Sequence, residues 1–299
     1  MLVLLPPSES KTAPDDGAPV DLAALGSPGL TKHRSVVLRA LAKASARRDA
    51  AAVLGVGPSL LAEVAANRHL RTGPSAAASS VYSGVLYAAA GLADLPDDAA
   101  RARAEDSIRI VSALWGLVRP ADRIPAYRLS MGTDLPGVGP LARAWRPLLA
   151  VELDPRAIAG ELIVDCRSAP YVAAWRPPSG TAGSTPSGTA GSTPTGTAGS
   201  TPTGTAGSTR SLPPIGGARW VAVRVLRELA GRRTVVSHSA KHTRGVLIRH
   251  LLVRPGPEPT TPLELLDAAR ELIGVDLLDA ELSDPTSART PHLLTLTVT

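Results

Sequence analysis

Apolar residues fall into short continuous runs and helical repeats that alternate along the chain. Residues 1–5 are an apolar run ended by Pro6-Pro7, which predicts a buried strand that leads into a loop. Further strands are predicted over 76–82, 108–114, 163–167, 220–228, 233–238 and 292–299. Helices are predicted over 32–47, 58–70, 85–92, 98–105, 141–152, 169–175, 241–253 and 262–273. This interleaving indicates an α/β (mixed α+β) fold, with a mixed sheet flanked by helices.

Residues 179–209 interrupt the pattern with a unit, TAGSTP followed by Ser or Thr and then Gly, that recurs every eight residues. The unit has no charged and no large apolar side chain, so it cannot bury enough surface to offset chain entropy. We therefore expect a disordered low-complexity loop inside one folded domain made of 1–178 and 210–299. A tolerated surface insertion explains the loop, since long surface loops cost little free energy. A binding role is the alternative.

The amino-acid composition lacks phenylalanine and has an excess of positive charge. Of the 299 residues 44% are hydrophobic but only 3% aromatic, so Leu, Val, Ile and Ala must fill the core. The formal charge is +6, and arginine supplies most of it, because the lysines are only Lys11, Lys32, Lys43 and Lys241. Such a charge favours a polyanionic partner, namely nucleic acid, anionic lipid or a phosphorylated ligand. A basic protein without such a partner is the alternative.

The single cysteine and the N-terminal sequence indicate a compartment. Cys166 alone cannot form an intramolecular disulfide, which suits a reducing cytoplasm, and we expect no disulfide-linked partner. The apolar N-terminus has no basic region before it, so it does not resemble a secretory signal. No stretch approaches the roughly 20 apolar residues of a membrane span, and we expect no membrane partner.

Hydroxyl groups and a lysine follow the first predicted strand. Ser8, Ser10 and Lys11 lie in the loop after it, where α/β proteins commonly place functional groups. They are candidates to bind a phosphate, although the glycines of a Walker A loop are missing. A solvated turn is the alternative interpretation.

Gly55 and Gly57 separate two predicted helices. A helix, a Gly-x-Gly turn and a second helix are typical of a helix-hairpin-helix element, since glycines let the backbone approach a phosphate closely. The N-terminal amides of the second helix would then face the anion. An ordinary helical hairpin is the alternative.

Two further loops follow predicted strands and combine charged with aromatic residues. The first contains Arg119, Asp122, Tyr127 and Arg128, which together present a stacking face and bidentate phosphate donors. Asp122 pairing with Arg119 or Arg128 to hold the loop is the structural alternative. The second loop has Asp165 and Arg167 at a strand end.

A fifth segment, SHSAKHTRG, leads from a strand into a helix. Lys241 and Arg244 are its cations, and helix-start amides add anion-binding capacity. His238 and His242 lack acidic or thiol partners at usual spacing, so we expect no metal site, and no cofactor is indicated.

These segments together resemble the peroxide-stress YaaA family. The resemblance rests on MLVLLPPSESKT, VYSGVLY, SALWGLVRPADRIPAYRLSMG, VDCRSAPYVAAW and SHSAKHTRGVLIRHLL. It implies a single α/β fold with a helix-hairpin-helix element and a positively charged cleft, in proteins that protect cells and DNA during peroxide stress. It also implies that Lys11, Tyr127, Arg128, Lys241 and Arg244 line the cleft, with Gly55 and Gly57 in the hairpin.

Three functions remain open from the sequence. The first is a DNA-binding protein of the oxidative stress response that holds the phosphate backbone without reading sequence. The second is a glycosylase- or lyase-like enzyme acting on nucleic acid or a nucleoside. In that case Lys11 or Lys241 is the candidate nucleophile, and Asp122 or Asp165 stabilises a developing cation. The third is a protein that binds a small phosphorylated ligand. We expect binding rather than catalysis.

Overall fold

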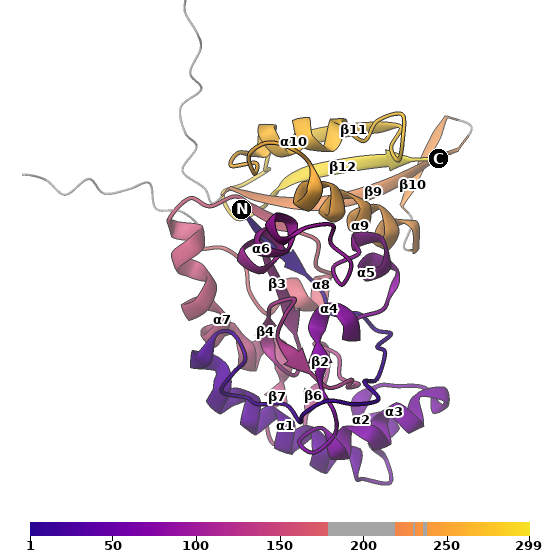
Figure 1. The fold of residues 1–299 in the computed structure, drawn as a ribbon, viewed down its shortest axis with the longest axis vertical. Helices are drawn as coiled ribbons and strands as arrows, with labels where there is room; N and C mark the ends of the chain where they lie inside the picture. Colours follow the sequence, from indigo (N-terminus) through magenta and orange to yellow (C-terminus); the bar gives the residue numbers. More distant parts are fainter. Residues whose placement is uncertain (179–218, 230, 236–237) are drawn as a thin grey trace, which may run out of the picture.

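The computed structural model describes residues 1–178, 219–229, 231–235 and 238–299 (Figure 1). An eight-stranded mixed sheet runs through it in the order β11-β12-β9-β8-β1-β3-β4, with β10 paired to β9. Its strands are β1 (Leu2–Leu5), β3 (Ile108–Ser112), β4 (Gly116–Val118), β8 (Ile163–Asp165), β9 (Trp220–Leu229), β10 (Arg232–Val235), β11 (Asp279–Ser283) and β12 (His292–Val298). The predicted α/β fold is confirmed, whereas the repeat lies outside the described residues.

The first strand occupies the centre of the sheet. Each residue of Leu2–Leu5 is buried, and β1 pairs in parallel with β3 on one side and β8 on the other. A parallel strand covered on both faces needs a continuous apolar sequence rather than an alternating one. Strands β9 and β12 continue the parallel arrangement, whereas β4, β10 and β11 are antiparallel to their neighbours.

The helices surround this sheet and two small two-stranded sheets. The helices are α1 (Thr31–Ser45), α2 (Ala50–Leu54), α3 (Leu61–Ala66), α4 (Ala78–Val81), α5 (Val85–Ala90), α6 (Asp98–Ser107), α7 (Leu141–Ile158), α8 (Ala169–Val172), α9 (His238–Val253) and α10 (Pro262–Arg270). Short 3₁₀ turns cover Pro28–Leu30, Pro58–Leu60 and Asn67–His69. The small sheets pair β2 (Ala76–Ala77) with β5 (Arg123–Ile124), and β6 (Asp134–Leu135) with β7 (Gly139–Pro140).

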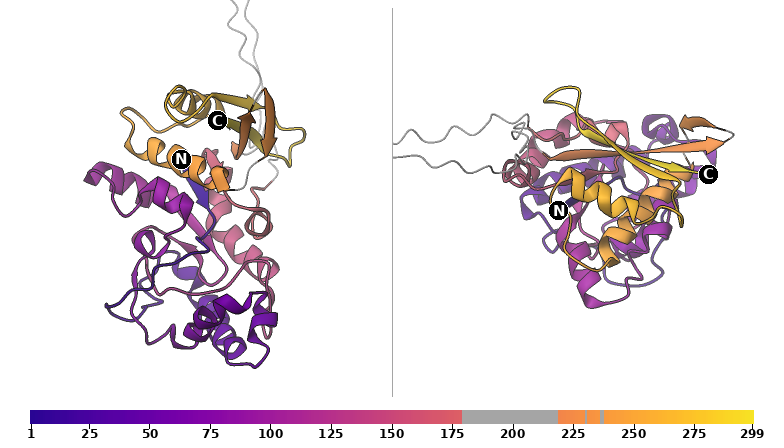
Figure 2. Two further views of the ribbon diagram at one scale, coloured as in Figure 1. Left: turned by 90° about the vertical axis from the view of Figure 1, so that its right-hand side faces the viewer. Right: turned by 90° about the horizontal axis from the view of Figure 1, so that it is seen from above.

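The molecule is elongated, with different elements at its two ends. Helices α1, α2 and α3 lie at one end, and α10, β11 and β12 lie at the other (Figures 1 and 2). Among the described helices, none is both long enough and apolar enough to cross a bilayer.

Helices α5 and α9 cross at close range because Gly245 has no side chain. A Cβ at Gly245 would overlap the carbonyl oxygen of Leu86 and lie 2.7 Å from the Cβ of Ala89. Glycine is therefore required for the two backbones to approach this closely. This contact gives the last residue of the AKHTRG segment a packing role.

Two segments differ from the sequence predictions in element type. The strand predicted over 76–82 is wrong beyond Ala77, because helix α4 begins at Ala78. Alanine and serine have little preference for a strand, and the Ala78 amide donates to the carbonyl of Asp122 at 2.8 Å. The single helix predicted over 58–70 is broken into a 3₁₀ turn, α3 and a second 3₁₀ turn.

Two other elements were missed or predicted too short. Strand β11 was not predicted, because it is an edge strand in which only Ala280 is buried. Helix α7 passes the expected end at Glu152 and continues through Pro155 to Ile158. Proline removes the bond to the carbonyl of Val151, but Val151 is exposed, so water can satisfy that carbonyl.

The helix-hairpin-helix element is not confirmed. Gly55 ends α2 in the left-handed conformation at φ 64°, and Gly57 precedes the 3₁₀ turn that leads into α3. The flanking helices have only five and six residues. A Cβ at either glycine would meet no atom within 4 Å, so the turn is open to its surroundings.

Candidate functional site

The loops after β1, β3 and β8 meet at the carboxyl edge of the sheet. β1 lies between the other two strands and all three run in parallel, so the chain leaves their ends on the same side. This change of strand order is where α/β sheets place their binding sites. Three of the predicted motif segments converge here.

The loop after β1 is held against the segment Tyr82–Gly84. Lys11 pairs with Tyr82 as an isolated bridge, and the Gly84 amide donates to Ser8 Oγ at 2.7 Å. A Cβ at Gly84 would overlap that oxygen, so a larger residue would displace the Ser8 hydroxyl and break this bond. Ser8 is therefore buried and engaged, while Ser10 is exposed and contributes its carbonyl to the amide of Ser83.

A chain of hydroxyl groups lies beneath Lys11. Tyr127 Oη is 2.7 Å from Ser112 Oγ and 3.0 Å from Tyr82 Oη, and all three side chains are buried. The amides of Leu114 and Trp115 donate to Ser112 Oγ, which fixes the turn after β3. Burial raises the pKa of Tyr127 to about 12, so the phenol remains protonated near neutral pH.

Lys11 lies over these rings in a half-buried position. Its Nζ is 4.5 Å from the Tyr127 ring centroid and 5.7 Å from that of Tyr82, and it donates to the carbonyl of Ser8 at 2.6 Å. Burial is the main cause that lowers the pKa of Lys11 to about 7, and the Arg128 charge adds to it. Glu63 and Glu9 oppose the shift without cancelling it. Near neutral pH the amine is partly uncharged.

Two predicted cations, Arg128 and Lys241, each lie near an acid that also acts on Lys11. Arg128 Nε donates to Glu63 Oε2 at 2.9 Å, and the backbone amide of Arg128 donates to Asn67 Oδ1 at 2.9 Å. Lys241 Nζ lies 4.0 Å from Glu9 Oε1, with half of its side chain exposed. Lys11, Tyr127 and Arg128 thus belong to one site, and Lys241 is linked to it through Glu9, so the charges are balanced rather than strongly positive.

Arg167 and Asp165 form a buried ion pair beside this site. Arg167 donates to both oxygens of Asp165, at 2.9 and 2.7 Å, and Trp220 Nε1 donates to the same carboxylate at 3.1 Å. Both side chains are almost fully buried. With these bonds made, neither residue is available to a phosphate, and the pair holds the loop after β8.

Arg119 and Asp122 line another cleft, bordered by residues 18–26 and Glu105. Asp122 accepts the amides of Arg119 at 2.8 Å and Gly26 at 2.9 Å. Asp122 thus holds the loop, but it does so by accepting backbone amides and not by pairing with an arginine side chain. Arg128 pairs with Glu63 rather than with Asp122.

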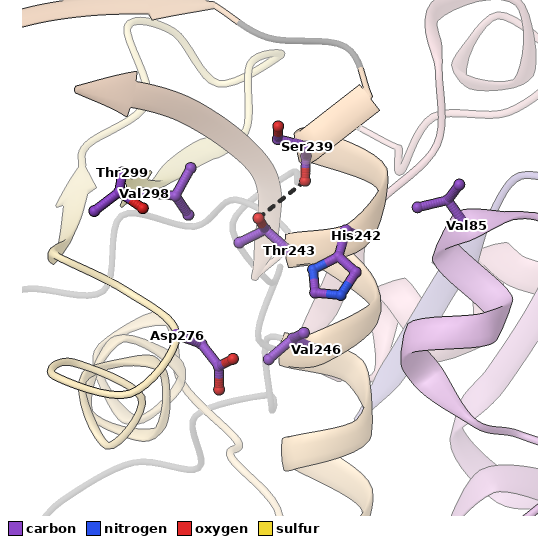
Figure 3. A pocket seen from close by; sticks show the side chains of 8 residues that line it. All are labelled: Val85, Ser239, His242, Thr243, Val246, Asp276, Val298 and Thr299. Atoms are coloured by element: carbon purple, nitrogen blue, oxygen red, sulfur yellow. Dashed lines mark hydrogen bonds between the residues drawn. The ribbon is translucent and has the colours of Figure 1, made fainter. Parts of the chain in front are cut away.

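Arg244 points from α9 to the sheet, where its guanidinium donates to the carbonyl of Val223 at 2.7 and 3.1 Å. The neighbouring face of α9 borders a cleft of about 400 Å³. Figure 3 shows its lining: Val85, Ser239, His242, Thr243, Val246, Asp276, Val298 and Thr299. Neither Lys241 nor Arg244 lines it, so this cleft is separate from the predicted cations.

The excess charge gathers in residues 31–72, which we call the basic segment. It contains eight Lys and Arg residues against two acids, so its formal charge equals the +6 of the whole chain. Six of these cations are exposed and form no ion pair or hydrogen bond through their side chains with any described residue. They are Lys32, Arg39, Lys43, Arg48, Arg68 and Arg71.

Sequence reasoning missed several residues of the Lys11 site. Tyr82, Ser112 and Glu63 were not site candidates, yet the first two carry the hydroxyl chain and the third pairs with Arg128. The tyrosines could have indicated this site from the sequence, because the chain has only four and all lie in motif segments. The ring centroids of Tyr87 and Tyr82 lie 5.1 Å apart. The pKa of Tyr171 is raised mainly by burial and also by the nearby Tyr127.

Comparison with known proteins identifies the family. Residues 1–186 match the family described as peroxide stress protein YaaA. A UPF0246 protein of Streptomyces coelicolor is 42% identical, over 91% of this chain and 90% of its own length. A UPF0246 protein of Corynebacterium efficiens is 38% identical over 90% of this chain and 92% of its own length. The chain therefore belongs to the peroxide stress protein YaaA family.

Proposed function

We propose that this protein acts in the peroxide stress response by binding the phosphate backbone of DNA through its basic segment. The six exposed cations without a described partner carry this proposal. Unpaired, hydrated cations neutralise DNA phosphates and release the counterions condensed on the duplex. The helices of this segment, α1, α2 and α3, lie at one end of the molecule (Figure 1).

The backbone at the glycine turn supports the same proposal. The open surroundings of Gly55 and Gly57 let a phosphate approach the main chain closely. Contacts of this kind fix a protein on the duplex without reading bases. The proposed binding is therefore strong at low salt and nearly independent of sequence.

A double substitution separates the basic segment from overall charge. Arg68→Gln with Arg71→Gln removes two exposed cations from the segment. Arg227→Gln with Arg289→Gln removes two exposed cations elsewhere. Affinity for a mixed-sequence 20-base-pair duplex is measured by fluorescence anisotropy from 50 to 200 mM salt. In a plot of the logarithm of the binding constant against the logarithm of salt concentration, each phosphate contact contributes a slope of about 0.9. The first variant should therefore reduce the steepness of this plot by about 2.

We expect the first variant to bind at least about tenfold more weakly at 100 mM salt, and the control variant to bind like the wild type. Equal losses in both variants would show that net charge alone attracts DNA. No binding by the wild type at 50 mM salt would remove the proposal.

A further inference from the structure

Lys11 differs from the other lysines in its surroundings. Lys32, Lys43 and Lys241 are exposed, whereas Lys11 is half-buried over Tyr127 at the carboxyl edge of the sheet. DNA-backbone binding uses neither this amine nor the tyrosines beneath it. A lysine that only served as a surface charge would gain nothing from this burial.

The surroundings of Lys11 favour its uncharged form. Tyr82 and Tyr127 cover one side, Arg128 adds positive charge, and Glu9 and Glu63 are the acids that act on the amine. With its pKa lowered to about 7, Lys11 has a substantial share of its amine in the free form at pH 7. A lysine with the ordinary pKa of about 10.4 would be free in only about 0.04% of molecules.

We propose that Lys11 is an amine nucleophile that forms an imine with an aldehyde carried next to a phosphate group. The amine nitrogen attacks the aldehyde carbon, and one amine proton passes to the carbonyl oxygen, which gives a carbinolamine. Loss of the hydroxyl group and the second amine proton as water then forms the carbon–nitrogen double bond. The step consumes no oxidant or reductant, and hydrolysis reverses it.

The phosphate requirement follows from two cations that share their acids with Lys11. Lys241 is half exposed and has only the long contact to Glu9, whose side chain is 83% exposed. Arg128 faces the same site and pairs with Glu63, which is itself half exposed. A phosphate next to the aldehyde can replace either exposed carboxylate, because a doubly charged anion attracts these cations more strongly.

An aldehyde beside a phosphate has two sources. One is a small sugar phosphate, and the other is the opened deoxyribose of an abasic site in DNA. Only the second source rests on the DNA binding proposed above, since imine formation with a small aldehyde needs no DNA. One probe for each source therefore tests the two ideas separately.

The experiment traps the imine in the wild-type protein at pH 7. Glyceraldehyde 3-phosphate, unphosphorylated glyceraldehyde or an abasic-site duplex is added with sodium cyanoborohydride, which reduces an imine to a stable amine. Peptide mass mapping then reports the adduct on each of the four lysines. We expect Lys11 to carry at least about ten times the adduct found on Lys32 or Lys43, with the phosphorylated probe exceeding glyceraldehyde.

The other lysines serve as internal controls, so the result does not depend on whether a variant folds. Lys11→Arg keeps the charge and should abolish only the Lys11 adduct. Adduct on Lys11 with glyceraldehyde 3-phosphate supports the proposal even if DNA binding fails. If the amount of adduct only reflects solvent exposure, so that Lys11 carries no more adduct than Lys32 and Lys43, the proposal is overturned. Equal labelling of Lys11 by the two glyceraldehydes overturns the phosphate requirement.

Discussion

Positive charges are paired or buried in the Lys11 site, whereas in the basic segment most of them are exposed and unpaired with described residues. In the first, Arg128 and Lys241 face Glu63 and Glu9, and burial partly discharges Lys11. In the second, six cations are exposed to solvent and form no ion pair with a described residue. The motif residues thus favour chemistry at an uncharged amine, and residues outside the motifs favour binding of a polyanion.

This difference shows that a net charge says little until its location is known. The sequence total of +6 is matched by residues 31–72 alone. The loop after β8 contributes nothing to it, because Arg167 is cancelled by Asp165 in the interior. The distinction leads to predictions with effects of different size.

The largest effect is expected where a motif cation is buried. Asp165→Asn leaves the Arg167 guanidinium without its charged partner and weakens the bond from Trp220. Breaking a buried pair on one side typically costs 3–5 kcal/mol, so we expect a loss of about that size in urea unfolding. Unchanged stability with weaker DNA binding would instead show that Arg167 contacts the ligand.

A smaller effect is expected from the desolvated amine. The pKa of Lys11 is about 7 when folded and 10.5 in the unfolded reference, so its burial destabilises the protein fully below pH 7. This cost fades between pH 7 and 10.5. Lys11→Met should therefore raise the melting temperature by at least about 2 °C at pH 6 and much less at pH 10.

Lys32→Met is the control, since it removes the same charge from an exposed position. Melting curves of both variants and the wild type are recorded at the two pH values. A stabilisation that is the same at both, or the same in both variants, would contradict the desolvation of Lys11.

The smallest effect is expected at the link between the two regions. Glu63 lies on α3 in the basic segment, pairs with Arg128 and raises the pKa of Lys11. Glu63→Gln should lower the pH midpoint of imine trapping by a few tenths of a unit, with a stability change below about 1 kcal/mol. Asp267→Asn, which breaks the exposed pair with Arg270, is the control and should leave the midpoint unchanged.

The fold was predictable where burial and periodicity agree. The central strand Leu2–Leu5 and helix α1 follow directly from their apolar patterns. Strand β11 was not predictable, because its pairing with β12 depends on backbone hydrogen bonds rather than on apolar side chains. Helix α4 depends in the same way on the distant carbonyls of Pro120 and Asp122.

The site was predictable only in part. Lys11, Tyr127 and Arg128 lie together because their loops follow strand ends, and Lys241 is linked to them only through Glu9. Their protonation and pairing were not predictable, because Glu9 and Glu63 reach them through tertiary contacts. Arg167 illustrates the limit, as a sequence does not reveal that two residues separated by one position form a buried pair.

Hydrogen–deuterium exchange of the wild-type protein, with and without a 20-base-pair duplex at low salt, tests the division of roles most directly. Our account predicts slower exchange in peptides from residues 31–72 when DNA is present, with little change in α9, α10 and β12. Protection confined to those C-terminal elements, with none in the basic segment, would contradict it.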